Sequence, residues 1–512
     1  MSILSIKNLS HIFESKTLFE NASFEINNGE HVGIVGLNGA GKTTFMNIIS
    51  GKIIQDSGEV KWLNGIKWDY LDQHADIDRT KTVMQYLESS FSNLFELEEK
   101  MQDAYAKMAE EDADFDALMD TAGKIQDKLL ADNFYEIETQ IKKVASGLGV
   151  SNFGYDTLIS TLSGGQRTKL MLAKLLIDKP QVMLLDEPTN FLDLEHIDWL
   201  ANYLNSFEGT ILLVSHDTEF LDKVCNLIIN VGNKDIKRYP GSYSYFLEQY
   251  EIEQKQMNEN YARQQREVKK IETFIAKNKA RAATAGMANS RKKLLDKMEI
   301  IDKPSQVYEA VFNFPYKEIV TKEMLKVNSL EIGYDKPLLP PLDMLLGSNS
   351  KIWIRGTNGI GKSTFLKTIM GEINALGGEF QFHPFAKIGY LEQDMDISTN
   401  EKNATAYINE LYPKMNNRDI KDKLSKVGIK NELLMKSLSK MSGGEQVRVK
   451  LLSISLKESN ILILDEPTNH LDVLAKNALK NALIAYEGAI ILVSHEPSFA
   501  EEICSAVFDV VQ

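Results

Sequence analysis

Short runs of apolar residues, many of them β-branched, recur along the chain, and each run ends in a turn of small or acidic residues. Three runs (HVGIVG, QVMLLD and TILLVS) lie in the first half, and three (KIWIRG, NILILD and AIILVS) lie in the second half. Sequences with helical periodicity separate them. Because buried strands that alternate with helices build sheets covered by helices, we expect an α/β fold with a mixed, mostly parallel sheet core.

The six runs belong to two copies of one pattern. GLNGAGKTTF, which starts at Gly36, reappears as GTNGIGKSTF from Gly356, a displacement of 320 residues. LLDEPTN from Leu184 reappears as ILDEPTN from Ile463, a displacement of only 279 residues. The difference of 41 residues between 320 and 279 is a net insertion in the first copy.

The domain organisation follows from this offset. We expect a first domain over 1–240 with a helical insertion at about 84–148, a charged α-helical linker over 241–305, and a second domain over 306–512. The linker sequence is rich in Glu, Gln, Lys and Arg, and its apolar residues recur at helical spacing. We expect a long helix, a tip of small residues at about 280–290, and a returning helix.

Both copies contain the pattern G-x-x-x-x-G-K-[ST] between a predicted strand and a predicted helix. Glycines let the backbone wrap a phosphate chain, and the N–H groups at the start of the helix attract anions. The lysines are placed to reach the β- and γ-phosphates of ATP, and the following hydroxyl is placed to bind Mg²⁺. The predicted residues are Gly36, Asn38, Gly39, Gly41, Lys42, Thr43 and Thr44 in the first copy, and Gly356, Asn358, Gly359, Gly361, Lys362, Ser363 and Thr364 in the second.

Paired acids end the strands VMLLDE and ILILDE. We expect Asp186 and Asp465 to hold Mg²⁺, directly or through water. Glu187 and Glu466 then lie where a base orients the attacking water, because phosphoryl transfer relies on positioned groups and neutralised charge. The reaction expected is hydrolysis of ATP to ADP and phosphate.

Two further pairs occupy matching places in the copies. His216 and His495 follow the strands ILLVS and IILVS, and we expect them to contact the γ-phosphate. Gln73 and Gln393 follow Tyr-Leu-acid, and they are placed to reach Mg²⁺ and the attacking water.

LSGGQ at 162–166 and SGGEQ at 442–446 resemble the signature loop of ATP-binding-cassette (ABC) ATPases. The resemblance implies a head-to-tail sandwich, in which the phosphate loop of one domain faces the signature loop of the other with ATP between them. It adds Ser163, Gly164 and Gly165, and Ser442, Gly443 and Gly444, to the ATP-binding residues. It also places Phe13 and Tyr334 against adenine.

The two copies differ within these motifs. The first reads TNFLD with Phe191 where the second reads TNHLD with His470, and SGGQ is replaced by SGGE. Both sets of catalytic residue types are present, so we expect two competent sites that are not necessarily equal.

Composition narrows the choice of partners. Hydrophobic residues make up 43% and charged residues 25% of the chain, which is ordinary for a globular protein, and the formal net charge is −14. The overall acidity argues against DNA or membrane binding by the whole surface. Cys225 and Cys504 are too few for an iron–sulfur cluster or a four-cysteine zinc site. Since neither a signal peptide nor about 18 consecutive apolar residues is present, we expect a cytoplasmic protein.

The linker contrasts with this acidity, because residues 261–300 contain 11 basic and four acidic residues. Tandem cassettes joined by such a linker, with no membrane domain, resemble the ABC-F family of translation factors. The resemblance implies a monomer that binds the ribosomal exit (E) site, with its linker near rRNA and the P-site tRNA. It also implies that the insertion touches the L1 stalk. This insertion is acidic (EEDADFD), so its expected contact is with protein or a basic surface.

Several alternatives are open. The chain is also compatible with the soluble ATPase of a transporter that has separate membrane subunits, or with an ABC-F factor that protects ribosomes from antibiotics. The short linker tip favours a housekeeping role in translation over resistance. DNA-repair cassettes carry zinc cysteines or very long coiled coils, and recycling cassettes carry iron–sulfur cysteines, neither of which the sequence has.

Overall fold

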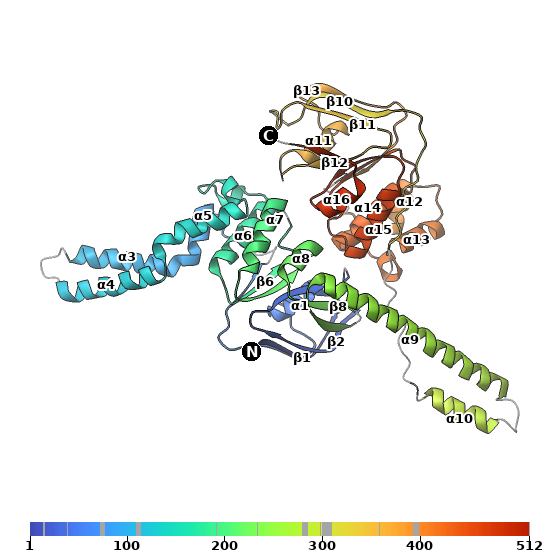
Figure 1. Ribbon diagram of the computed structural model, residues 1–512, viewed down its shortest axis with the longest axis horizontal. Helices are drawn as coiled ribbons and strands as arrows, with labels where there is room; N and C mark the ends of the chain where they lie inside the picture. The colour runs from blue at the N-terminus through green and yellow to red at the C-terminus, as the bar shows by residue number, and fades with distance from the viewer. Residues whose placement is uncertain are drawn as a thin grey trace.

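The computed structural model shows two α/β lobes in contact, with a helical arm extending from the first lobe and a helical hairpin between the lobes in sequence (Figure 1). The described residues are 1–13, 16–37, 39–71, 77–108, 114–190, 192–232, 234–278, 285–296, 298, 310–357, 359–392 and 399–510.

Each lobe has a central sheet of short, buried strands. The strand order is β5-β6-β7-β3-β8-β9 in the first lobe and β14-β15-β16-β12-β17 in the second. Neighbouring strands run parallel, and β9 adds an antiparallel edge to the first sheet. The bounds are β3 His31–Val35, β5 Trp68–Leu71, β6 Val182–Asp186, β7 Thr210–Val214, β8 Leu227–Gly232, β9 Asp235–Pro240, β12 Lys351–Arg355, β14 Ile388–Leu391, β15 Ile461–Asp465, β16 Ala489–Val493 and β17 Ala506–Asp509. The predicted α/β fold with a mixed sheet core is confirmed.

A three-stranded antiparallel sheet and one helix cover one face of each central sheet. In the first lobe these elements bury Phe19 and Phe45 against Leu184 and Leu212. Met183 and Leu213 are directly adjacent to Leu184 and Leu212 in the same strands, and they face a second core on the other side, because side chains alternate along a strand. The bounds are β1 Ser2–Phe13, β2 Lys16–Asn27, β4 Ser57–Trp62 and α1 Lys42–Ile49, and then β10 Glu323–Glu331, β11 Leu342–Gly347, β13 Gly377–Phe382 and α11 Lys362–Ile369.

The second core of each lobe is helical. Its helices in the first lobe are α6 Gly164–Asp178, α7 Leu194–Asn205 and α8 Thr218–Val224, and in the second lobe α14 Gly443–Ser455, α15 Val473–Ala485 and α16 Pro497–Ile503. Each lobe adds a second group of helices. These are α2 Val83–Glu88, α3 Ser92–Lys107, α4 Phe115–Ala131 and α5 Ile137–Gly147 in the first lobe, and α12 Ala404–Leu411 and α13 Asn417–Lys426 in the second.

Helices α3 and α4 pack against each other as an antiparallel pair and form the arm of Figure 1. Among the described residues, the matching place in the second lobe has only the two shorter helices α12 and α13. The arm therefore accounts for the net insertion in the first copy.

The segment between the lobes forms α9 Tyr243–Asn278 and α10 Ala285–Asp296, which pack against each other. The prediction of two helices here agrees with the structure, but the expected tip at 280–290 does not. Helix α10 begins six residues before Arg291, because Ala and Met favour helices and Gly286 costs only about 1 kcal/mol. The remainder of the predicted tip, and the end of the linker beyond 298, lie outside the described residues.

Within the part of the chain that the structure describes, no helix combines the length and the apolar character that crossing a membrane requires.

Gly147 and Gly123 give a paired test of helix packing in the first lobe. A Cβ at Gly147 would lie 2.0 Å from the Trp199 ring, whereas a Cβ at Gly123 would meet no atom within 4 Å. We expect Gly147→Ala to lower the melting temperature, because the clash outweighs the gain in helix propensity. Gly123→Ala should raise stability by about 0.5–1 kcal/mol. Thermal unfolding of both variants checks this, and equal shifts would contradict the packing described.

Candidate functional site

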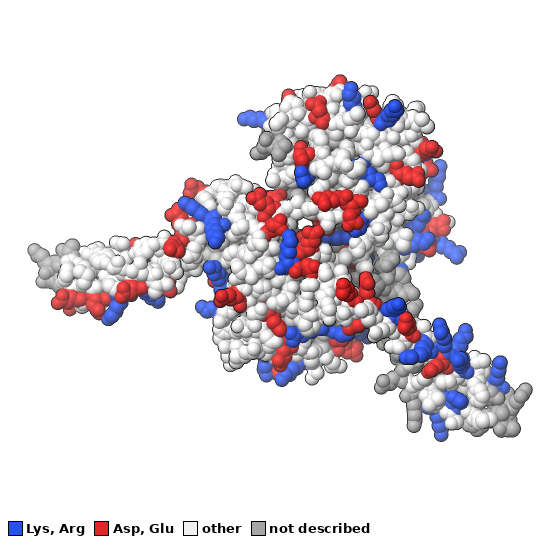
Figure 2. Space-filling view, in the orientation of Figure 1, with Lys and Arg blue, Asp and Glu red and all other residues white. Residues whose placement is uncertain are grey.

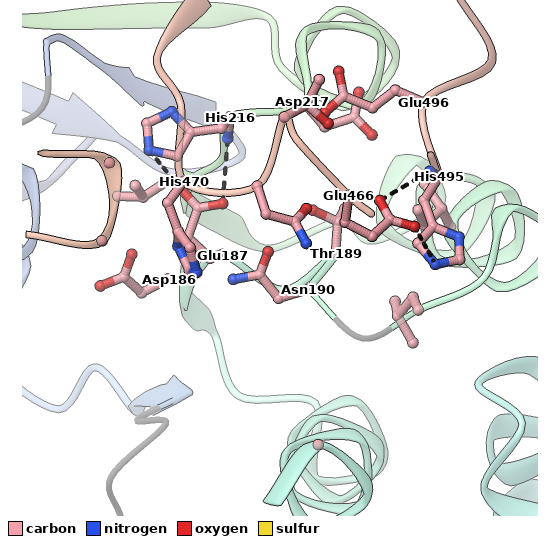
Figure 3. Close-up of a pocket in the computed structure, with 18 of the residues that line it drawn as sticks. Asp186, Glu187, Thr189, Asn190, His216, Asp217, Glu466, His470, His495 and Glu496 are labelled. Carbon is pink, nitrogen blue, oxygen red and sulfur yellow. Dashed lines mark hydrogen bonds and ion pairs between the residues drawn. The ribbon is translucent and has the colours of Figure 1, made fainter. Parts of the chain in front are cut away.

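A cavity of about 830 Å³ lies between the two lobes, at the carboxyl ends of both parallel sheets. Figure 3 shows acidic and histidine side chains of both lobes converging on it. The residues predicted from the sequence that line this cavity are Gly39, Gly41, Lys42, Thr43, Thr44, Ser163, Gly165, Asp186, Glu187, His216, Gly359, Gly361, Lys362, Ser363, Thr364, Ser442, Gly443, Gly444, Asp465, Glu466 and His495. Both phosphate loops and both signature loops thus border one space.

Other predicted residues lie elsewhere. Gly36, Gly356 and Gly164 belong to the same loops but do not line the cavity. Phe13 and Tyr334 are 49% and 67% exposed and are not in its lining. Asn38, Asn358, Gln73, Gln393 and Phe191 lie outside the described residues.

The phosphate loops need glycine for steric reasons. Gly36 has φ 153°, and a Cβ there would lie 2.2 Å from the carbonyl oxygen of Val231. Gly41 has φ 106° and precedes the first turn of α1, a backbone conformation that favours glycine. Burial lowers the pKa of Lys42, whose Nζ donates to the Gly36 carbonyl oxygen at 2.9 Å. In the second lobe Lys362 donates to Gly356 in the same way at 2.7 Å.

The two strand-end glutamates have strained backbones. Glu187 and Glu466 both have φ 50°, the left-handed region that costs a non-glycine residue roughly 1–3 kcal/mol. The N–H of Glu187 donates to the carbonyl oxygen of Val214 at 2.9 Å, and that of Glu466 to Val493 at 3.0 Å. Sheet hydrogen bonds thus hold both residues in this conformation, which is common at functional sites.

Each glutamate contacts the histidine that follows the next strand. The backbone N–H of His216 donates to Glu187 Oε2 at 3.3 Å, and its Nε2 lies 3.4 Å from Oε1. In the second lobe the corresponding distances between His495 and Glu466 are 3.2 Å and 3.0 Å. The dashed lines in Figure 3 mark these contacts.

Burial sets the protonation of both pairs. It raises the pKa of Glu187 and of Glu466 to about 8, and the adjacent Asp186 and Asp465 add to this effect. Burial lowers the pKa of His216 to about 3 and that of His495 to about 4. In the protein alone at neutral pH, both partners of each contact are therefore uncharged. Charges brought in by a ligand can change that balance.

The signature loops are capped alike despite their different sequences. Ser163 accepts from the backbone N–H of Gln166 at 3.3 Å, and the Gln166 side chain accepts from the N–H of Ser163 at 2.8 Å. Ser442 and Glu445 form the same capping box at 3.4 Å and 2.9 Å. Replacing SGGQ by SGGE thus keeps the loop geometry.

Comparison with known proteins agrees with this geometry. A family model described as ABC transporter matches residues 19–190 and 339–469, and a second model of that description matches 229–314. The chain is 43% identical to the uncharacterized ABC transporter ATP-binding protein YfmM of Bacillus subtilis, over 99% of this chain and 98% of that protein. It is 32% identical to ABC transporter F family member 5 of Arabidopsis thaliana, over 99% of this chain and 75% of that protein.

The chain belongs to the ABC-F family of ATPases. It binds and hydrolyses ATP, as the sequence predicts. Its fold is similar to that of the archaeal ribosome recycling factor aABCE1, with a TM-score of 0.60 at 18% identity, over 98% of this chain and 87% of that one. The two lobes are hereafter called the first and second cassettes.

The donor set of the ABC-F ATPase suits a magnesium nucleotide. In each cassette a hydroxyl at the start of a helix and a carboxylate at the end of a strand border the cavity: Thr43 with Asp186, and Ser363 with Asp465. Mg²⁺ prefers such oxygen ligands and commonly combines one or two protein groups with phosphates and water.

Charged residues that belong to none of the predicted motifs also lie at the site. Asp217, Glu496 and Lys476 line the cavity at the contact between the cassettes, and Arg448 pairs with the buried Asp472 just behind the second signature loop. A signal for Lys476 exists in the sequence, because aligning the two copies places it opposite an isoleucine.

Removing the two buried carboxyl groups is expected to stabilise the ABC-F ATPase increasingly as pH rises. Between 4.5 and about 8, the folded state keeps a proton on Glu187 and on Glu466 that the unfolded chain has released. Their contribution is thus fully present below pH 4.5 and is lost as pH rises through about 8. Above pH 6.5 both histidines are mainly neutral in either state, so they contribute little.

The measurement is thermal unfolding without nucleotide. Between pH 6.5 and 8 the two glutamates together lower the free energy of unfolding of the wild type by a few kcal/mol, about 2 kcal/mol per site. The double variant Glu187→Gln with Glu466→Gln should therefore melt at a higher temperature than the wild type, and the difference should be larger at pH 8 than at pH 6.5. The exposed pair Glu195→Gln with Glu501→Gln is the control. A difference that does not grow with pH would contradict the assigned burial.

Proposed function

We propose that this ABC-F ATPase closes on two ATP molecules, binds the ribosomal E site in that closed state, and is released after hydrolysis. The observation that carries the proposal is a basic helical hairpin attached to an otherwise acidic ATPase. Electrostatic attraction to an RNA backbone is then confined to one element of the molecule. The proposal places the protein in the cytoplasm as a monomer.

Each ATP is proposed to bind between one phosphate loop and the opposite signature loop. The first ATP site combines Gly39, Lys42, Thr43, Gln73, Glu187 and His216 with Ser442 and Gly444. The second ATP site combines Gly359, Lys362, Ser363, Gln393, Glu466 and His495 with Ser163 and Gly165. The shared cavity supports this pairing, because residues of both cassettes border one space.

Residue roles follow from the chemistry of the groups. The hydroxyl and aspartate of each site hold Mg²⁺, the lysine binds the β- and γ-phosphates, and the glutamate orients the attacking water. The histidine beside each glutamate is placed to contact the γ-phosphate. Phe13 and Tyr334, whose rings are exposed, supply the aromatic contact to adenine.

The linker charges support a contact with rRNA and the P-site tRNA. Figure 2 shows Lys and Arg side chains gathered on the α9–α10 hairpin. All eight described basic residues between 261 and 296 are at least partly exposed: Arg263, Arg266, Lys269, Lys270, Lys277, Arg291, Lys292 and Lys293. A solved structure of similar fold, with a TM-score of 0.58 at 19% identity, shows ribosome-bound archaeal Pelota and ABCE1.

The arm carries charge of the opposite sign. Residues 84–148 contain 15 acidic and six basic residues, and the acidic side chains follow one edge of the α3–α4 pair in Figure 2. Such a surface repels phosphate. We propose that the arm contacts the L1 stalk through protein or another basic surface.

Ribosome binding is tested with the hydrolysis-deficient variant Glu187→Gln with Glu466→Gln. It should bind ATP but not hydrolyse it, because neither site retains the group that orients the water. In the presence of ATP we expect it to sediment with ribosomes, and in ADP to remain free. An ATP-loaded variant that stays free of ribosomes would refute the proposed function and leave the ATPase assignment intact.

The role of the linker is tested by reversing four exposed charges, Lys269→Glu, Lys270→Glu, Lys292→Glu and Lys293→Glu. We expect loss of the ribosome-stimulated ATPase rate, because several phosphate contacts are replaced by repulsion. The rate without ribosomes should persist, since α9 and α10 do not line the cavity. The matched control reverses four exposed lysines elsewhere: Lys7, Lys326, Lys414 and Lys421. Loss of both rates in the linker variant would mean that the hairpin serves folding.

A further inference from the structure

Lys476 lies one turn into α15 and reaches from the second cassette to the first. Its side chain is buried, with 9% of the residue exposed. Its Nζ donates to the backbone carbonyl oxygen of His216 at 3.2 Å and to Glu496 Oε1 at 2.6 Å. His216 belongs to the first cassette, and Glu496 directly follows His495 in the second. One ammonium group therefore connects the two histidine segments.

The first cassette has an isoleucine at the matching position. The displacement of 279 residues between the copies places Ile197 opposite Lys476. Ile197 lines the same cavity, but an aliphatic side chain cannot donate to the carbonyl oxygen of His495. The contact made by Lys476 at the first ATP site therefore has no counterpart through Ile197 at the second.

The charge of Lys476 also offsets a pair of acids at the contact between the cassettes. Asp217 of the first cassette and Glu496 of the second lie close together in Figure 3. Burial raises the pKa of Asp217, the charge of Glu496 raises it further, and Lys476 opposes that effect. Without the ammonium group, two partly buried carboxyl groups would face each other across the interface, which costs free energy.

We propose that Lys476 is a positioning residue of the first ATP site. While the cassettes are closed, it holds the His216 segment in place, and with it the contact between His216 and Glu187. The bond crosses the interface, so opening the cassettes breaks it. The first site thus depends on closure through a contact that Ile197 cannot make at the second site. The inference uses the ATPase activity and the proposed pairing of the cassettes, and it does not depend on ribosome binding.

The test separates the two sites with single glutamine variants. Glu466→Gln leaves the first site to turn over, and Glu187→Gln leaves the second. Adding Lys476→Met to the first background should lower kcat about tenfold, because displacement of the His216 segment misaligns the groups that act in the transition state. KM for ATP should change little, since Lys476 does not belong to the phosphate loop. In the second background kcat should stay within about twofold.

Two further variants separate positioning from structure. Lys476→Arg keeps a cation whose N–H groups can donate to the same two oxygen atoms, and it should restore most of the rate. Lys480→Met is the matched control, because Lys480 lies one turn further along α15 and pairs with Glu502 of its own cassette at 2.8 Å. It should leave the rate in both backgrounds unchanged.

The single variant Lys476→Met, compared with the wild type, gives the same test without the glutamine backgrounds. In a single turnover, Lys476→Met should slow one of two phases of phosphate release and spare the other. Equal loss at both sites, loss at neither, or no recovery with Lys476→Arg would overturn the proposal. Failure of ribosome binding would leave it standing, because every readout is taken without ribosomes.

Discussion

The two cassettes meet along the carboxyl ends of their parallel sheets, and Glu187 and Glu466 line one cavity between them. Burial raises the pKa of both glutamates and lowers that of the neighbouring histidines. The sheets hold both glutamates in a left-handed backbone that only surrounding hydrogen bonds can maintain. Because residues of both cassettes border the cavity, we expect opening of the cassettes to hydrate these groups and to bring their pKa values closer to those in water.

The linker helix α9 is anchored in the first cassette. Helix α9 begins inside the first cassette, where Tyr243 and Phe246 are buried in the helical core and pack near Tyr239 of the last strand. The hydroxyl of Tyr239 donates to Glu253 at 2.8 Å, two turns beyond Phe246. These contacts hold the first turns of α9 to the first cassette. A rotation of that cassette would therefore carry the start of the basic hairpin with it.

The sequence could predict those features that depend on a few adjacent residues, but not those that depend on contacts between distant ones. Short motifs form the phosphate loops, the strand-end acids and the signature loops, and the strand or helix that positions each motif is adjacent to it in the sequence. Spacing along the chain alone therefore predicts Lys42, Glu187 and Ser163 as site residues. The predicted start of the returning helix was wrong because a run of small residues also suits a break, although Ala285 and Met287 favour a helix. Lys476 belongs to no motif, and its importance arises from a carbonyl group 260 residues away in sequence. Such a contact is defined by the docking of two domains, which no local pattern encodes.

The duplication explains why two ATP sites are proposed, and the differences between the copies explain why the two need not be equal. Next to the first ATP site the opposite cassette has Arg448, which pairs with the buried Asp472, and Lys476, which pairs with the partly buried Glu496. At the second, the matching positions are Lys169, whose pKa burial lowers, and Ile197. Both ion pairs lie within the second cassette, whereas the hydrogen bond from Lys476 Nζ to the carbonyl oxygen of His216 crosses to the first cassette and is lost when the two separate. A small opening of the cassettes should therefore disturb the first site before the second. Unequal sites on one interface allow hydrolysis to proceed in a defined order.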